Sequence, residues 1–188
     1  IRIPLFDPDR MLTGHAALGR ALFAPAGLCA VLVLFAVAGA FAFIDWDAIR
    51  GYWSARGFTR YSVLLIPFVY VVMKIAHELA HGLAAKRWGA EVHDMGVVLL
   101  LLIPIPYVDT SAAWAFPEKS RRLIVGAAGI LAELVLAAIA TIVFVLVEPG
   151  VVKDVAYTAM LLGSISTVFF NGNPLLRFDG YYVLADAV

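Results

Sequence analysis

The sequence predicts an all-α polytopic membrane protein with about four transmembrane helices and a short re-entrant strand or hairpin between the second and third. Composition is the first reason. Hydrophobic residues make up 63% of the 188 residues, charged residues only 15%, and mean hydropathy is +0.92, whereas a soluble domain is about half apolar and a quarter charged. The second reason is that several charge-poor stretches reach the roughly 20 residues that a membrane helix needs. The formal net charge is zero, which gives no electrostatic basis for binding nucleic acid.

Four spans are expected, at about residues 21–44, 61–85, 123–147 and 155–172. The first has no charged residue, and Pro25 falls in its first turns, where a missing N–H is tolerated. Asn171-Gly172-Asn173-Pro174 breaks the last span. Residues 1–20 are expected to form a surface or interfacial lead-in, and the polar stretches 45–60 and 109–122 to form loops. We expect residues 1–188 to be a single intramembrane core of a longer chain, because the sequence opens on Ile1 rather than Met.

Residues 96–108 are apolar but too short to cross a bilayer as a helix. Pro104 and Pro106 also favour extended backbone in the residues before them. Extended backbone survives at membrane depth only where protein or a cavity satisfies its polar groups. This segment is therefore expected to be a re-entrant strand or hairpin packed against the helices.

Basic residues indicate the orientation, because cytoplasmic loops carry an excess of Lys and Arg. With the N-terminus inside, nine basic residues lie on the cytoplasmic side: Arg2, Arg10, Arg20, Lys86, Arg87, Lys119, Arg121, Arg122 and Arg177. Four lie outside: Arg50, Arg56, Arg60 and Lys153. The N-terminus is thus expected in the cytoplasm, and the second span then runs inward.

A His-Glu-x-x-His sequence, His77 to His81, lies near the inner end of that second span. Residues four apart share one face of a helix, about 6 Å apart along its axis, so both imidazoles can approach one metal ion. Glu78 lies beside the first histidine, where its carboxylate can take a proton from water at that ion. The alternative is a helix that happens to carry two histidines near its end.

Asp179 is the expected third ligand. It is the only acidic residue between Asp154 and Asp186, and it follows the helix break of the fourth span at a depth near that of the histidines. Two imidazoles and one carboxylate leave a fourth tetrahedral position, as catalytic zinc sites require. An ordinary Asp-Gly turn is the alternative for this position, and Asp109 and Glu133 are the next candidates for the ligand.

The two motifs together resemble the site-2 proteases, the M50 family of intramembrane zinc metalloproteases. That family pairs HExxH with NxxPxxxxDG on a later helix, and the second motif reads here as Asn171-x-x-Pro174-x-x-x-x-Asp179-Gly180. The resemblance implies one zinc ion per chain, held by His77, His81 and Asp179, with Glu78 as the general base. It also implies Asn171 near the substrate or the developing oxyanion. The sequence from Asn173 to Tyr182 resembles that of a bacterial branch of the family, the peptide zinc metalloproteases.

The function implied is zinc-dependent hydrolysis of peptide bonds in a peptide or a single-span membrane protein, within the lipid bilayer. The location implied is the bacterial cytoplasmic membrane, with the active site toward the cytoplasm. One alternative is a non-catalytic, site-2-protease-like component of a peptide export or maturation system. A transporter built on the broken helix is a weaker alternative. The stretch 97–103 either pairs with a substrate strand or only packs against the helices.

Two charged residues lie within the expected spans at similar depth. Lys74 is about eleven residues from the inner end of its helix and Glu133 about twelve, or roughly 17 to 18 Å at 1.5 Å per residue. A lone charge at mid-membrane costs on the order of 3 kcal/mol, so these two are expected to pair; the alternative is contact between Lys74 and Glu78. Glu133 also replaces the small or neutral residue of the family's GxxxN, GxxxS or GxxxG element, which begins here at Gly129. His93 and Trp114 are expected to be structural or interfacial.

Overall fold

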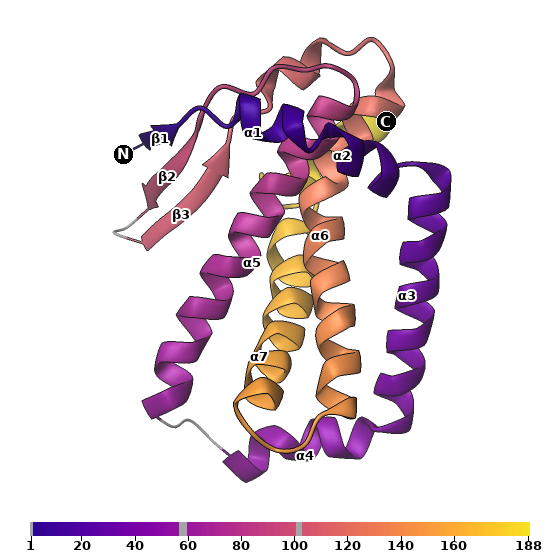
Figure 1. The fold of residues 1–188 in the computed structure, drawn as a ribbon, viewed down its shortest axis with the longest axis vertical. Coiled ribbons are helices and arrows are strands. Elements are labelled where there is room, and N and C mark those ends of the chain that lie inside the picture. Colours follow the sequence, from indigo (N-terminus) through magenta and orange to yellow (C-terminus); the bar gives the residue numbers. More distant parts are fainter. Residues whose placement is uncertain (1, 57–59, 101–102) are drawn as a thin grey trace.

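The computed structural model describes residues 2–56, 60–100 and 103–188, and this part of the chain is mostly helical (Figure 1). Four helical segments within it are long and apolar enough to cross a membrane: α3 (Pro25–Ile44), α5 (Arg60–Arg87), α6 (Lys119–Leu146) and α7 (Val151–Ile165) with the π-helical turn that continues it (Ser166–Asn171). The all-α polytopic class is thereby confirmed. The bounds of these segments differ from the expected spans by up to four residues.

Helix α6 is the centre of the bundle. It lies between α3 and α5 in Figure 1, and it also contacts α7 and α8 (Asp179–Ala187). Its buried residues are mostly small, among them Ala128, Gly129, Ala137 and Ala140. Small residues allow helix backbones to approach closely in a membrane. The close packing of α5 and α7 on α6 positions the site described below.

The segment 45–60 was expected to be a loop, and that expectation is wrong for residues 46–56. These residues form helix α4 (Trp46–Arg56), which lies across the ends of α6 and α7 (Figure 1). Ile49 and Tyr52 are one helical turn apart and pack in one cluster with Phe144 and Tyr157, where the Tyr52 and Phe144 ring centroids are 5.0 Å apart. Residues on one face of a helix can be buried even when its mean hydropathy is low, so polar composition alone was a poor guide here. Residues 57–59 lie outside the described residues.

The N-terminal lead-in is folded onto the same end of the bundle as the C-terminus (Figure 1). It forms strand β1 (Arg2–Phe6) and helices α1 (Asp9–Gly14) and α2 (Ala16–Leu22). The Asp9 carboxylate accepts a hydrogen bond from the Val92 backbone N–H at 2.9 Å and pairs with Lys86. The bonds from Lys86 and from the Val92 N–H hold the pKa of Asp9 below its usual range. This segment therefore anchors the loop that follows α5, a contact between residues too distant in sequence for a periodic pattern to predict.

The apolar segment after α5 forms a hairpin, as expected. Strands β2 (Met95–Leu100) and β3 (Ile103–Val108) pair antiparallel, and β1 adds to the other side of β2 in the order β1-β2-β3. The third strand was not predicted. Residues 101 and 102 of the expected re-entrant segment lie outside the described residues, and its entry into the membrane stays a prediction. The connection from β3 to α6 contains a 3₁₀ helix (Ser111–Ala115) instead of a continuous loop.

The described part of β2 leaves little room for a further strand beside it at residues 97 and 98. Val97 and Val98 pair with β3 on one side and with β1 on the other. On β3, the Asp109 N–H bonds to the Asp94 carbonyl at 2.8 Å. Alternate residues of an antiparallel strand direct their backbone N–H and C=O groups to the same side. The backbone groups of residues 104, 106 and 108 therefore point away from β2, toward the unpaired edge of β3. Two of these are prolines without N–H groups, and the Val108 N–H is bonded to a side chain of α5. Both sides of β2 are thus occupied at Val97 and Val98, the unpaired edge of β3 offers backbone acceptors at residues 104 and 106, and pairing of this stretch with a substrate stays a prediction.

Candidate metal centre and cavity

The expected ligands converge at one point. Among the described residues, His77, His81 and Asp179 form a group whose ligand atoms all lie within 4.8 Å of one another. His77 Nε2 is 2.9 Å from Asp179 Oδ2, His81 Nε2 is 3.3 Å from the same oxygen, and the two Nε2 atoms are 3.1 Å apart. Ligands about 2.0 to 2.2 Å from a tetrahedral zinc ion are roughly 3.3 Å from each other. The spacing of these three atoms fits a shared zinc ion.

Hydrogen bonding also leaves the correct nitrogen free on one histidine. His81 Nδ1 lies 2.7 Å from the Val125 carbonyl oxygen, so Nδ1 carries the proton and donates it to that oxygen. The lone pair of Nε2 then points toward the other two ligands. Asp179 Oδ2 is buried and receives no hydrogen bond of acceptable angle, although both imidazoles are near. Lone pairs brought this close together are the expected arrangement for donors to one cation.

Two glycines make the convergence sterically feasible. A Cβ atom at Gly129 on α6 would overlap Nε2 of both His77 and His81. A Cβ atom at Gly180, directly after Asp179, would lie 2.6 Å from the carbonyl carbon of Gly172. Helix α8 can therefore begin close against the end of the π-helical turn, which brings Asp179 up to the histidines of α5.

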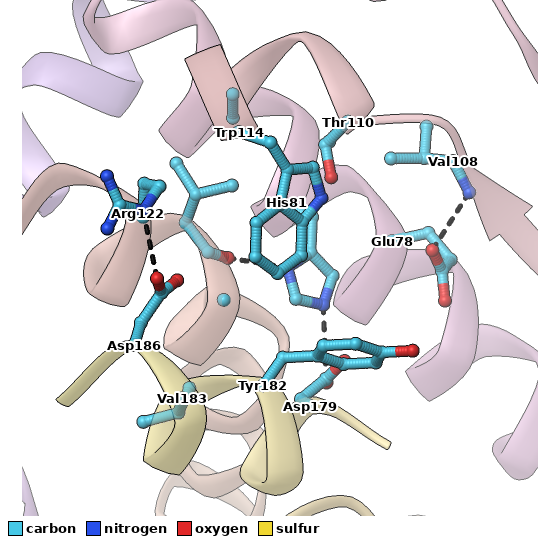
Figure 2. A pocket seen from close by; sticks show the side chains of 13 residues that line it. Glu78, His81, Val108, Thr110, Trp114, Arg122, Asp179, Tyr182, Val183 and Asp186 are labelled. Atoms are coloured by element: carbon cyan, nitrogen blue, oxygen red, sulfur yellow. Dashed lines mark hydrogen bonds and ion pairs between the residues drawn. The ribbon is translucent and has the colours of Figure 1, made fainter. Parts of the chain in front are cut away.

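A cavity of about 190 Å³ opens beside this centre (Figure 2). Glu78, His81 and Asp179 line it, and the Val108 N–H holds Glu78 by a 2.9 Å hydrogen bond to Oε2. Across the cavity, Arg122 donates to Asp186 at 2.9 Å (Figure 2). The general-base candidate thus reaches a space large enough for water and part of a peptide.

An aromatic pair that sequence reasoning did not assign to the site lies on the cavity wall. The rings of Trp114 and Tyr182 meet edge to face with centroids 5.6 Å apart, in front of His81 and Asp179 as Figure 2 is drawn. Trp114 was expected to be an interfacial anchor, and it is exposed as well as lining the cavity. No spacing in the sequence links Trp114 to Tyr182, because the contact depends on how α8 folds back.

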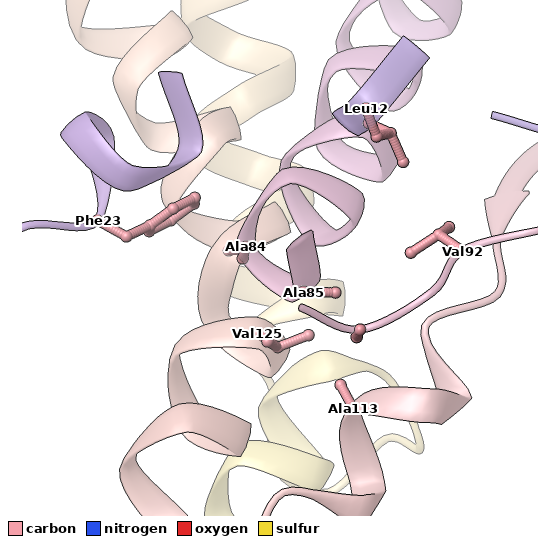
Figure 3. Packing of buried hydrophobic residues seen from close by; sticks show 9 residues of the cluster. Leu12, Phe23, Ala84, Ala85, Val92, Ala113 and Val125 are labelled. Atoms are coloured by element: carbon pink, nitrogen blue, oxygen red, sulfur yellow. The ribbon is translucent and has the colours of Figure 1, made fainter. Parts of the chain in front are cut away.

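An apolar cluster fixes the floor of the cavity (Figure 3). Ala84 and Ala85 from the last turns of α5 pack with Val92, Ala113 and Val125, all of them almost fully buried. Val125 and Ala113 also line the cavity. The residue whose carbonyl bonds His81 is thus held in a close-packed core, which limits movement of that imidazole.

A second polar group lies on the other side of His77. The expected pair of Lys74 and Glu133 is confirmed, with Nζ 2.6 Å from Oε1. Asn171 donates to Glu133 Oε2 at 2.8 Å and is not among the cavity-lining residues. The structure thus places Asn171 beside Glu133, and its role toward a substrate stays a prediction. Thr167 also bonds Oε2, at 3.0 Å; its spacing of four residues from Asn171 in an apolar helix was a signal that sequence reasoning did not use.

Together, the fold and the site define a polytopic helical membrane protein with a donor set that catalytic zinc sites use. Comparison with known proteins then identifies the family: a model of peptidase family M50 matches residues 63–171, and the chain belongs to that family. The matched segment contains His77, Glu78, His81 and Asn171, and Asp179 follows it. A 61-residue segment, 32% of this chain, is 38% identical to uncharacterized protein MJ0971 of Methanocaldococcus jannaschii, where it spans 17% of that protein. No solved structure matches the chain significantly.

Proposed function

We propose that the chain is a zinc-dependent intramembrane endopeptidase of the site-2 protease type, acting on a peptide or a single-span membrane protein. The observation that carries the proposal is the meeting of His77, His81 and Asp179 from two distant segments, next to Glu78 at a cavity of about 190 Å³. Membership of peptidase family M50 supports the same reaction class.

The ligands would be the Nε2 atoms of the two histidines and the carboxylate of Asp179. Bound zinc supplies Lewis acidity, which acidifies water and polarises a peptide carbonyl. Glu78 takes the proton from water and delivers it to the departing amine. The Val108 N–H fixes the carboxylate of Glu78 at the cavity wall for this transfer. The Val125 carbonyl keeps His81 in the tautomer that leaves Nε2 available.

The substrate must present an extended bond to this centre. In a helix each carbonyl is hydrogen-bonded within the segment, so a helical substrate has to unwind before hydrolysis. The outer edge of β3 ends at Val108, whose N–H already binds Glu78. A substrate chain close to that edge is therefore led to the base as well as to the cavity.

We further propose that the site faces the cytoplasm of a bacterial cell. The N-terminal strand and the C-terminus lie toward one end of the bundle (Figure 1), and the proposed ligand Asp179 begins the C-terminal helix α8. The excess of Lys and Arg expected on the N-terminal side supports a cytoplasmic location for that end.

Glu78→Gln tests the proposal directly. The variant should retain zinc, because Glu78 is not one of the ligands, and should lose at least about 100-fold of the cleavage rate, the lower range for a positioned proton carrier. Zinc content by elemental analysis and cleavage of a fluorogenic transmembrane peptide are measured on purified full-length protein in bilayers. Glu148→Gln, at an exposed position just after the end of α6, is the matched control. Near-parent turnover by zinc-loaded Glu78→Gln protein would remove Glu78 from the mechanism, and a zinc-free parent would favour a non-catalytic component.

A further inference from the structure

Glu133 is a carboxylate sealed inside the bundle and surrounded by donors. It is 1% exposed. Lys74 contacts Oε1 at 2.6 Å, while Thr167 and Asn171 donate to Oε2 at 3.0 and 2.8 Å. Lys74 also donates to Ser166 at 3.2 Å. We call these five residues the Glu133 cluster: Lys74, Glu133, Ser166, Thr167 and Asn171. A buried charge without such partners is strongly destabilising, and the cluster satisfies both oxygens.

The cluster also contacts His77, the first proposed metal ligand, at Nδ1, the ring nitrogen that does not face Asp179. His77 Nδ1 lies 3.1 Å from Glu133 Oε1, the oxygen that Lys74 also contacts. The angle is not that of a hydrogen bond, since Nδ1 has no partner of acceptable geometry. The two atoms are nevertheless within hydrogen-bonding distance, while Nε2 on the same ring is 2.9 Å from Asp179 Oδ2. A carboxylate behind a ligating imidazole fixes its tautomer and orientation.

The cluster also reaches the third ligand, through the backbone. Asn171 ends the π-helical turn, in which the Gly172 N–H bonds to the Thr167 carbonyl at 2.7 Å. Gly180 packs against this backbone: a Cβ atom there would lie 2.9 Å from the Asn171 carbonyl oxygen. Asp179 is the neighbour of Gly180. The hydrogen bond from Asn171 to Glu133 therefore fixes the backbone on which Gly180 packs, and with it the position of the neighbouring Asp179.

We propose that Glu133 is a positioning residue for two metal ligands, His77 directly and Asp179 through Asn171. On this view Asn171 acts on the metal centre and not on the substrate. The positive charge of Lys74 compensates the negative charge of the Glu133 carboxylate, so that this carboxylate can accept hydrogen bonds from the other donors inside an apolar bundle. The inference depends on the proposed function, because it concerns the ligands of the zinc ion proposed there.

The test measures zinc affinity and ligand geometry, which a purely structural role would leave unchanged. Two variants of the full-length protein are compared with the parent: Asn171→Ala, and Glu133→Gln combined with Lys74→Met so that no charge is stranded. Zinc affinity is measured by competition with a chelator, and the visible spectrum of the cobalt-substituted protein reports on the geometry. Each variant should bind zinc about 10- to 100-fold more weakly, the range typical for residues that orient metal ligands, with an altered cobalt spectrum. Thr141→Val, which removes a buried hydroxyl bonded to the Ala137 carbonyl in the same helix, should change neither.

The outcomes separate this inference from the proposed function. Parent-like zinc affinity and cobalt spectra in both variants would overturn the inference and leave the protease proposal intact. Loss of cleavage in Asn171→Ala with undiminished zinc affinity would assign Asn171 to the substrate and also overturn it. A parent that binds no zinc would refute the proposed function and, with it, the inference. If the Glu133→Gln combination does not fold, Asn171→Ala decides the question, since it leaves the pair of Lys74 and Glu133 in place.

Discussion

The proposed metal ligands His77, His81 and Asp179 lie between two polar regions that differ in their access to solvent. On one side is the cavity, with Glu78 and the pair of Arg122 and Asp186 on its walls. On the other is the Glu133 cluster, where the Lys74 and Glu133 side chains are 9% and 1% exposed. The void beside that pair is about 10 Å³, the lower limit for holding one water molecule. Groups in the cavity can exchange partners with water and substrate, whereas those in the cluster depend on one another.

The difference explains why the two regions use different residue types. The proton-carrying role proposed for Glu78 needs room for water and a single orienting bond, which the Val108 N–H provides. A sealed carboxylate needs several donors, because burial makes each unsatisfied oxygen costly. The predictions below test this contrast between an open and a sealed region, beginning with the ligands that lie between them.

Gly129→Ala should have the largest effect on the metal centre. Its methyl group would overlap the ligating nitrogens of both histidines, so zinc affinity should fall by more than the roughly 10- to 100-fold that changes around a ligand produce. Chelator competition measures the affinity. Gly126→Ala is the control one turn away, where the added Cβ meets only a methyl of Val183 at 3.2 Å; it should bind zinc nearly as the parent does. Equal zinc affinities in the two variants would show that Nε2 of His77 and Nε2 of His81 do not lie against Gly129.

Lys74→Met should destabilise the protein by about 3 to 5 kcal/mol, the range for a buried charge that loses its partner. The combined change of Lys74→Met and Glu133→Met should cost less, because no charge is left behind. Unfolding of the purified protein in detergent, followed by circular dichroism, compares the single and double variants. Simple additivity of the two single changes would mean that the pair is not coupled and that the cluster is not sealed.

Much of the fold and of the candidate site could be predicted from the sequence. The features that could not be predicted depend on contacts that residue spacing does not encode. The meeting of His77, His81 and Asp179 follows from two motifs, since the spacing of His77 and His81 fixes a shared helix face. The pairing of Lys74 with Glu133 follows from the cost of charge at membrane depth. The contact of Asn171 with Glu133 could not be predicted, because the π-helical turn rotates the helix face by an amount that residue spacing does not encode. Helix α4 and strand β1 were missed because their stability comes from tertiary contacts instead of local periodicity.

Asp186→Ala tests the cavity side by the same unfolding in detergent that is used for Lys74→Met. It should cost about 1 kcal/mol, less than Lys74→Met, because this part-buried ion pair borders the cavity, where water can weaken it. The Arg122 and Asp186 side chains are 19% and 14% exposed, so water can partly replace the lost partner. Arg122 also keeps its 2.7 Å hydrogen bond to the Phe116 carbonyl. Asp47→Ala, whose partner Arg50 is on the surface of α4, is the control and should change stability little. A cost as large as that of Lys74→Met would show that the cavity wall is as dry as the Glu133 cluster.

The smallest effect is expected at His93, a surface histidine that was expected to be structural. Asp7 contacts its Nδ1 at 2.9 Å and Glu91 its Nε2 at 3.3 Å. Bonds to Asp7 and then to Glu91 raise the pKa of His93 above its ordinary value of 6.5. The stabilisation is therefore fully present below pH 6.5, the pKa in the unfolded chain, and is lost as the pH rises through the higher folded pKa.

Nuclear magnetic resonance of the imidazole protons in the full-length protein measures this titration. The midpoint of His93 should lie above 6.5 and should fall in Asp7→Asn, because the largest contribution to the shift is removed. Stability should change only slightly across this pH range, because an exposed pair gains little from an interaction that water can replace. An unchanged His93 midpoint in Asp7→Asn would show that Asp7 does not contact His93 in the purified protein.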